Sequence, residues 1–124
     1  MKAALAVIVV IAAAALVVVA VGFGGGTSGS AGGGDPALGK QLIGAFGCGG
    51  CHRIAGVAGA DGRVGPSLHD LAARRVIAGS LPNTPENVAA WISDPKAVDP
   101  STLMPDLGVT RSQATAIADY LYQH

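Results

Sequence analysis

The chain has 124 residues, of which 50% are hydrophobic but only 4% aromatic and 13% charged. Eight Lys and Arg residues balance eight Asp and Glu residues, so the composition lacks the basic excess of a nucleic-acid-binding protein and the acidic block of a solvating tail. We therefore expect no nucleic-acid partner. Most of the apolar excess lies near the N-terminus, because residues 3–21 are all Ala, Val, Leu or Ile and no charge occurs between Lys2 and Asp35.

Residues 1–23 are predicted to form one uncleaved transmembrane helix. As a helix, residues 3–23 would extend over roughly 30 Å, the hydrocarbon thickness of a bilayer. A cleaved signal peptide is the alternative, but its apolar region has only about 7–15 residues, and Val18-Val19-Ala20 is a poor cleavage site. Because Lys2 and the amino terminus carry the positive charges beside the span, we expect the remainder on the periplasmic or extracellular side of a bacterial cytoplasmic membrane.

Residues 24–34 contain only Gly, Ser, Thr and Ala, a composition that cannot bury a core. We predict a flexible linker here and a folded domain over residues 35–124. At 90 residues, the apolar core of a bare domain gives only marginal stability. A buried cofactor would add to it.

The only two cysteines, Cys48 and Cys51, are followed directly by His52. This C-x-x-C-H spacing is typical of one covalently bound haem c, with two thioether bonds and the imidazole on the iron. A redox-active cysteine pair, half of a zinc site and a structural disulfide are the alternatives. A zinc site would need two more ligands, and His69 and His124 lack the paired spacing of zinc modules.

Met104 is the candidate for the second axial ligand. An iron that only transfers electrons is best held six-coordinate, and Met104 is the one methionine besides the initiator. Pro105 follows it and stiffens the loop that would hold the thioether. Filling of a core gap is the alternative role for this methionine. We therefore predict His52 and Met104 as the metal ligands and give the exposed His69 and the terminal His124 no part.

Three helices are expected in the domain. Asp35-Pro36 is a helix start that leads to about Phe46, and Thr84-Pro85-Glu86 starts a helix that stops before Pro95. Thr110 and Gln113 form a capping-box pattern ahead of a C-terminal helix. The Gly- and Pro-rich loops between them leave no room for a sheet, so we predict an all-α domain.

From Asp35 onward the sequence resembles a class I, mono-haem cytochrome c. The motifs that carry the resemblance stand in the order of that family: Gly39-Lys40-Gln41-Leu42, Cys48-Gly49-Gly50-Cys51-His52, Gly65-Pro66-Ser67-Leu68, Met104-Pro105 and Ala118-Asp119-Tyr120-Leu121. The resemblance implies a cytochrome c fold of about three to five helices around one haem. It also implies that Gly39 and Ile43 cross Ile117 and Tyr120 where the terminal helices meet.

Within that family, the chain resembles the cytochrome c domain of subunit II of caa3-type oxidases. The similar segments are residues 81–87, Trp91-Ile92, Asp94-Pro95 and residues 102–105. The copper-binding domain expected upstream of such a domain is not among the 124 residues. This favours an anchored carrier or a small subunit of a respiratory complex.

The resemblance implies further cofactor-binding residues. The carbonyl of Pro66 should accept the imidazole proton of His52 and so fix its tautomer. Trp91, Arg74 and Arg75 are candidate donors to the haem propionates, because a buried carboxylate needs a partner. Core packing for Trp91 and solvation for the two arginines are the alternatives.

We expect an electron carrier and not an enzyme, with no small-molecule substrate. Its partners would be the membrane, through residues 3–23, and membrane complexes of a respiratory or photosynthetic chain, from a quinol-oxidising complex to a terminal oxidase. The alternatives are an integral subunit of a larger oxidoreductase, in which the Ala-rich span packs among other helices, and a gas-binding or sensory haem protein. The last would need an open sixth position, which Met104 argues against.

Overall fold

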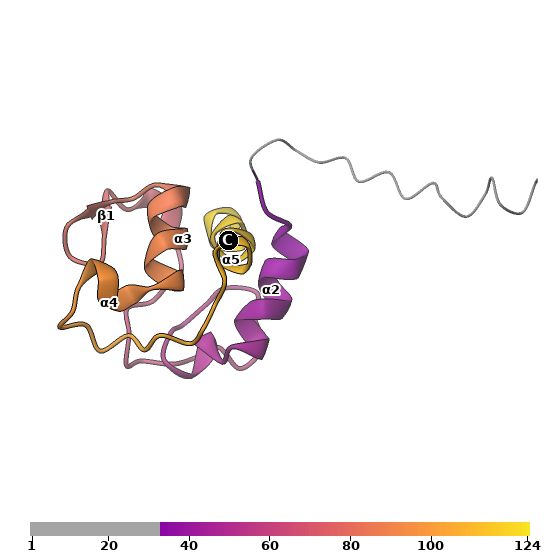
Figure 1. Cartoon of the computed structure of the whole chain (residues 1–124). Coiled ribbons are helices and arrows are strands. Elements are labelled where there is room, and N and C mark those ends of the chain that lie inside the picture. Colours follow the sequence, from indigo (N-terminus) through magenta and orange to yellow (C-terminus); the bar gives the residue numbers. More distant parts are fainter. Residues whose placement is uncertain (1–32) are drawn as a thin grey trace, which may run out of the picture. The chain divides into compact units, whose positions relative to one another are not determined.

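The computed structural model describes residues 33–124 (Figure 1). Its elements are α2 (Pro36–Ala45), η1 (Cys48–Gly50), η2 (Leu71–Ala73), β1 (Val76–Ile77), β2 (Leu81–Pro82), α3 (Pro85–Ser93), α4 (Pro95–Val98) and α5 (Arg111–Gln123). The predicted membrane helix and the linker up to residue 32 lie outside the described residues. No helix within residues 33–124 is both long enough and apolar enough to cross a bilayer.

The three predicted helices are confirmed as α2, α3 and α5, and each begins at its expected cap. The Asp35 carboxylate accepts the Ala37 N–H at 2.9 Å at the start of α2. The Thr84 hydroxyl accepts from Asn87 at the start of α3, and a reciprocal capping box opens α5. These contacts satisfy backbone donors that have no partner inside the helix, which explains why short local motifs locate the helix starts.

The structure adds elements that the sequence analysis missed, among them a pair of strands and a short helix. A short antiparallel pair joins Val76 to Pro82 and Ile77 to Leu81, so the expectation that no sheet occurs was wrong. Its turn places Ala78 at φ 47° and Gly79 at φ 81°, a pair of positive angles that closes a tight hairpin. Strands of two residues are too short to show an alternating pattern, so only the turn could have indicated them. The short helix is α4, one turn that starts at Pro95.

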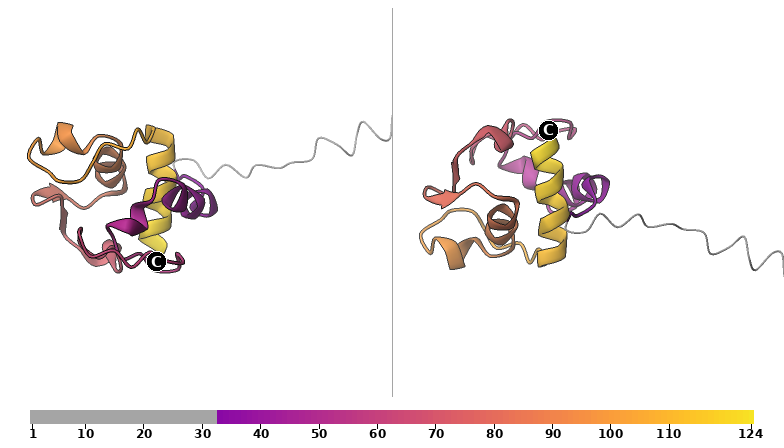
Figure 2. Two further views of the ribbon diagram at one scale, coloured as in Figure 1. Left: turned by 90° about the horizontal axis from the view of Figure 1, so that it is seen from below. Right: turned by 90° about the horizontal axis from the view of Figure 1, so that it is seen from above.

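Helices α2 and α3 lie on opposite sides of α5, and all three views in Figures 1 and 2 show this arrangement. Where α2 meets α5, Gly39 lies directly against the backbone of Ala116, and a Cβ at position 39 would collide with the Ala116 carbonyl. Ile43 and Ile117 are fully buried beside this contact. Gly39 therefore permits the helix crossing that the resemblance implied.

This close contact predicts the effect of a single methyl group on stability. Gly39→Ala should destabilise the haem-loaded protein by about 1–3 kcal/mol, because the new Cβ must push α2 away from α5. The matched control is Gly44→Ala in the same helix, where no atom lies within 4 Å of the added Cβ. That change should stabilise by about 0.5–1 kcal/mol through helix propensity. Urea unfolding followed by circular dichroism measures both, and equal shifts for the two variants would contradict the assigned contact.

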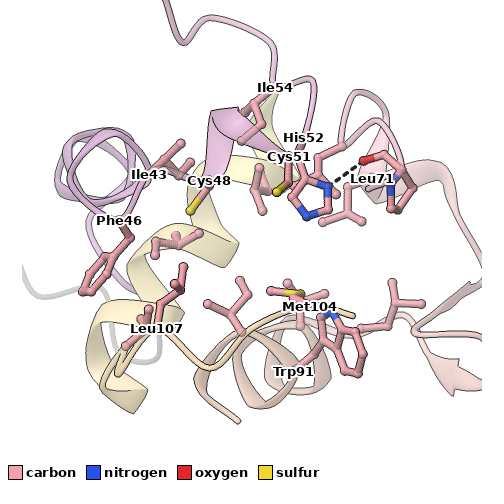
Figure 3. Close-up of a pocket in the computed structure, with 18 of the residues that line it drawn as sticks. Ile43, Phe46, Cys48, Cys51, His52, Ile54, Leu71, Trp91, Met104 and Leu107 are labelled. Carbon is pink, nitrogen blue, oxygen red and sulfur yellow. Dashed lines mark hydrogen bonds between the residues drawn. The ribbon is translucent and has the colours of Figure 1, made fainter. Parts of the chain in front are cut away.

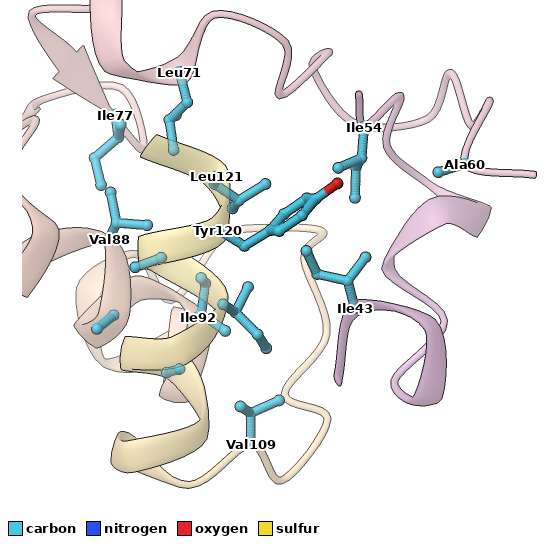
Figure 4. Packing of buried hydrophobic residues seen from close by; sticks show 14 residues of the cluster. Ile43, Ile54, Ala60, Leu71, Ile77, Val88, Ile92, Val109, Tyr120 and Leu121 are labelled. Carbon is cyan, nitrogen blue, oxygen red and sulfur yellow. The ribbon is translucent and has the colours of Figure 1, made fainter. Parts of the chain in front are cut away.

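The hydrophobic core is built on α5, whose apolar face packs towards α2 on one side and towards α3 and η2 on the other (Figure 4). Leu121 lies near Leu71 and Val88, and Tyr120 points towards Ile54. The Tyr120 hydroxyl donates a hydrogen bond to the carbonyl of Ala55 at 2.8 Å. This bond joins the loop after the cysteine motif to the C-terminal helix.

Candidate haem-binding site

An apolar cavity lies beside this core (Figure 3). Side chains of α2, α3, α5 and the connecting loops line it. They include Ile43, Phe46, Cys48, Cys51, His52, Ile54, Leu68, Leu71, Ile77, Val88, Trp91, Ile92, Met104, Leu107, Val109, Ile117 and Leu121. Of the lining residues within the described part of the chain, only Arg74 carries a permanent charge. A cavity of this kind suits a large, flat, mostly apolar group.

The cysteine motif forms one wall of the cavity. Gly47 adopts a left-handed conformation at φ 69°, which turns the chain from α2 into η1. The N–H groups of Cys51 and His52 both donate to the carbonyl of Cys48, at 3.2 and 3.0 Å. This tight turn directs the two thiols and the imidazole to the same side, as Figure 3 shows.

The backbone of residues 60–65 supports the motif from behind. The N–H of Gly62 donates to the carbonyl of Gly49 at 3.0 Å. A Cβ at Gly49 would lie 2.7 Å from the Cα of Ala60, and a Cβ at Gly65 would lie 2.7 Å from Nδ1 of His52. Neither position therefore has room for a Cβ atom: Gly49 lies against the backbone of Ala60, and Gly65 leaves space for the imidazole ring of His52.

The ring of His52 is oriented by a single hydrogen bond. Nδ1 lies 2.7 Å from the carbonyl oxygen of Pro66, which can only accept, so Nδ1 carries the proton. The lone pair is then on Nε2, and in Figure 3 this nitrogen points into the cavity. The contact that the resemblance implied is thus present, and it fixes the tautomer that a metal ligand needs.

Met104 and Trp91 lie on the opposite wall. The sulfur of Met104 points across the cavity towards the wall that holds the motif (Figure 3). Trp91, from α3, lies beside Met104 and lines the cavity with it. The Met104 N–H donates to the hydroxyl of Thr102 at 3.1 Å. The structure therefore brings the two predicted metal ligands to facing positions.

Of the two predicted arginines, only Arg74 reaches the cavity. Arg74 lines the cavity, and its guanidinium donates to the carbonyl of Ser67. Arg75 is exposed and is not among the lining residues. Arg74 has extended backbone angles, so neighbouring side chains point to opposite sides. The structure keeps Arg74 and Trp91 as candidate propionate donors and does not bring Arg75 to the site.

The remaining histidines lie outside the cavity lining. His69 is exposed, with its ring 3.4 Å from the carboxylate of Asp70. His124 stacks on Tyr120 with ring centroids 4.1 Å apart, and its Nδ1 donates to the Tyr120 carbonyl at 3.0 Å. The stacking of the terminal residue was not predicted, although residues four apart on a helix lie on the same face.

The donor set fits haem c. Both thiols are free of any disulfide, and burial raises the pKa of the Cys48 thiol, which keeps it protonated at neutral pH. Within residues 33–124, no three His, Cys, Asp or Glu side chains converge on a point where they could share a metal ion. Cys48 and Cys51 can form the two thioether bonds, and the His52 imidazole and the Met104 thioether are a known axial pair for haem iron.

Phe46 and Leu107 also line the cavity, although the sequence analysis did not predict them. Nothing in their local sequence distinguishes them from other apolar residues.

The fold and the site define a small helical domain of the class that attaches haem covalently through a C-x-x-C-H motif. Residues 36–124 match the family described as Cytochrome c, and the chain belongs to the cytochrome c family. Members of this family carry electrons on covalently bound haem c.

Two relatives agree with the resemblance seen in the sequence. Cytochrome c oxidase subunit 2 of Alkalihalophilus pseudofirmus is 39% identical over 67 residues, which cover 54% of this chain and 19% of that protein. Cytochrome c oxidase subunit 2 of Bacillus sp. strain PS3 is 35% identical over 78 residues, which cover 60% of this chain and 22% of that protein. The chain thus spans about a fifth of each relative. No solved structure matches it significantly.

Proposed function

We propose that this cytochrome c is a membrane-anchored carrier that moves single electrons from a quinol-oxidising complex to a terminal oxidase. The observation that carries the proposal is the facing pair of His52 and Met104 across an apolar cavity. When bound, haem c would supply an iron that exchanges single electrons. His52 and Met104 would hold it from the protein side in both oxidation states, which suits a carrier more than a catalyst.

The residues of the cavity perform distinct tasks. Cys48 and Cys51 would hold the haem through thioether bonds to its vinyl groups, so the cofactor would not dissociate between encounters. Pro66 holds the imidazole of His52 in its ligating tautomer. Around a bound haem, the apolar lining would exclude water and so lower the reorganisation that accompanies a change of charge. Met104 would supply the second ligand that a gas-binding or catalytic haem lacks.

The link to a terminal oxidase rests on the two relatives, both named as oxidase subunits. These same names support a second candidate, an integral cytochrome subunit of a larger oxidoreductase complex. Copurification from membranes in mild detergent separates the two: a fixed subunit should remain with its complex in constant ratio, whereas a carrier should be released.

The membrane location rests on the sequence of residues 1–34. An anchor over residues 3–23 and a linker of 11 residues would hold the domain at a root-mean-square distance of roughly 18 Å from the bilayer. After the linker, the sequence has seven basic and eight acidic residues, so long-range charge steering is weak. Confinement near the membrane instead raises the effective concentration of the domain towards its partners.

This arrangement predicts how electron transfer responds to salt and to release. In membranes, quinol-driven reduction and oxidase-driven oxidation should change by less than about threefold between 0.05 and 0.5 M salt. Cleavage at a protease site placed after Phe23 should slow both by about tenfold or more at equal total cytochrome. Stopped-flow absorbance of the haem measures the two rates. A steep salt dependence with undiminished rates for the released domain would show that a charge patch recruits the partners.

A further inference from the structure

We propose that Lys96 and Thr102 are positioning residues that hold the Met104 thioether in place for the iron. The inference deepens the proposed function and rests on it, because it requires Met104 to be an axial ligand. Neither residue lines the cavity. Both act through the backbone of the loop between α4 and Met104.

The origin of this loop is anchored in the core. Pro95, the first residue of α4, is fully buried. The Asp94 carboxylate caps α4 by accepting the N–H of Ala97 at 3.0 Å, and the Asp99 N–H donates to the Pro95 carbonyl at 2.9 Å. Lys96 therefore extends from a short helix whose backbone is fixed on both sides.

The loop itself has little apolar packing to hold it. Leu103, next to Met104, is 93% exposed, and Ser101 and Pro105 are also exposed. A loop without buried apolar side chains opens easily unless polar contacts close it. Apart from Met104, which is partly buried and packs against the core, the segment must therefore be ordered by hydrogen bonds.

Lys96 supplies the first set of these bonds. Its ammonium donates to the carbonyl of Thr102 and lies 3.4 Å from the carbonyl of Pro100. Hydrogen bonds from a charged donor are stronger than neutral ones. The ammonium thus draws two carbonyls of the loop towards α4.

Asp99 completes the turn below the ammonium. Its carboxylate accepts from the N–H and the hydroxyl of Ser101 at 2.9 and 2.6 Å, and its carbonyl accepts from the Thr102 N–H at 3.1 Å. The bonds from Ser101, with a smaller contribution from the charge of Lys96, lower the pKa of Asp99. Asp99 is therefore ionised at neutral pH and remains an acceptor.

Thr102 connects this turn to the ligand. Its carbonyl accepts from Lys96, while its hydroxyl accepts the N–H of Met104 at 3.1 Å. On the other side, Pro105 restricts the backbone of Met104 to extended angles. A thioether is a weak ligand, so the ordering of this loop decides how well Met104 competes with an added ligand for the iron.

The test is a titration of the full-length, haem-loaded ferric protein with imidazole, followed by loss of the near-infrared sulfur-to-iron band. Lys96→Ala and Thr102→Val should each raise the apparent affinity for imidazole about three- to tenfold, because the loop opens more often. Thr102→Ser, which keeps the hydroxyl, and Lys96→Arg, which keeps a cationic donor, should recover most of the loss.

Matched controls separate positioning from general destabilisation. Lys40→Ala removes an exposed lysine from α2, and Thr115→Val removes a hydroxyl that bonds within α5 at 3.0 Å. Both should stay within about twofold of wild type for imidazole. Covalent haem content and the urea midpoint should be the same in Lys96→Ala and Lys40→Ala.

Two results would overturn the proposal, and they differ. Imidazole affinities of Lys96→Ala and Thr102→Val within about twofold of wild type would show that the contacts do not position Met104. Absence of the sulfur-to-iron band from the wild-type protein would remove Met104 as a ligand, and with it the basis of the proposed function as well.

Discussion

Replacing both Cys48 and Cys51 with Ala is expected to abolish covalent haem attachment. The two thiols lie on the same wall of the cavity, and they are the only cysteines of the chain. No other side chain can form a thioether with a vinyl group. Extraction with acidified acetone should therefore move the haem of the double variant into the organic phase, while the haem of the wild type stays with the protein.

Single variants and one distant variant serve as controls for this result. Cys48→Ala and Cys51→Ala should each keep one thioether, and Met104→Ala should keep both. Mass spectrometry of the denatured chains distinguishes these cases by the mass of attached haem. Loss of haem from the wild type under the same extraction would contradict covalent attachment and would leave the cysteines to a disulfide or a redox pair.

Met104→Ala is expected to remove the sulfur-to-iron band of the ferric protein and to open the sixth position. Met104 is the only methionine besides Met1, and its sulfur faces the wall that holds His52. Without it, added imidazole competes with water only, so its apparent affinity should rise by more than about tenfold. The reduction potential should fall, because a thioether ligand raises the potential of haem iron. Absorbance titration and redox potentiometry measure the two effects.

Leu103→Ala is the matched control for this variant. Leu103 precedes Met104 in the same loop and is 93% exposed, so its truncation leaves the thioether in place. The band and the imidazole affinity should stay close to those of the wild type. Persistence of the band in Met104→Ala would show that another sulfur binds the iron and would exclude Met104 as the axial ligand.

The features that the sequence determined by itself are those encoded by neighbouring residues. The starts of α2, α3 and α5 depend on a cap and the first helical turn, so Asp35, Thr84 and Thr110 located them correctly. The spacing of Cys48, Cys51 and His52 suits two thioethers and one ligand on a single turn. For these features no distant contact was needed.

The lining of the cavity depends on contacts between residues that are distant in the sequence. Arg74 and Arg75 are adjacent and identical in type, and only the extended backbone between η2 and β1 turns one towards the cavity and the other to solvent. The hairpin that follows depends on Asn83, whose amide donates to the carbonyls of Leu71 and Arg74 at 2.7 and 2.9 Å.

The position of Met104 also depends on contacts between segments that are distant in the sequence. Met104 was predicted as the second ligand because the chain has no other methionine besides Met1, but nothing in its local sequence showed how it would be held. Lys96 reads as one more exposed charge until α4, anchored by the buried Pro95, places its ammonium on the loop carbonyls. Such contacts form only when the core sets two segments side by side, so their energies belong to the tertiary structure and not to any stretch of sequence.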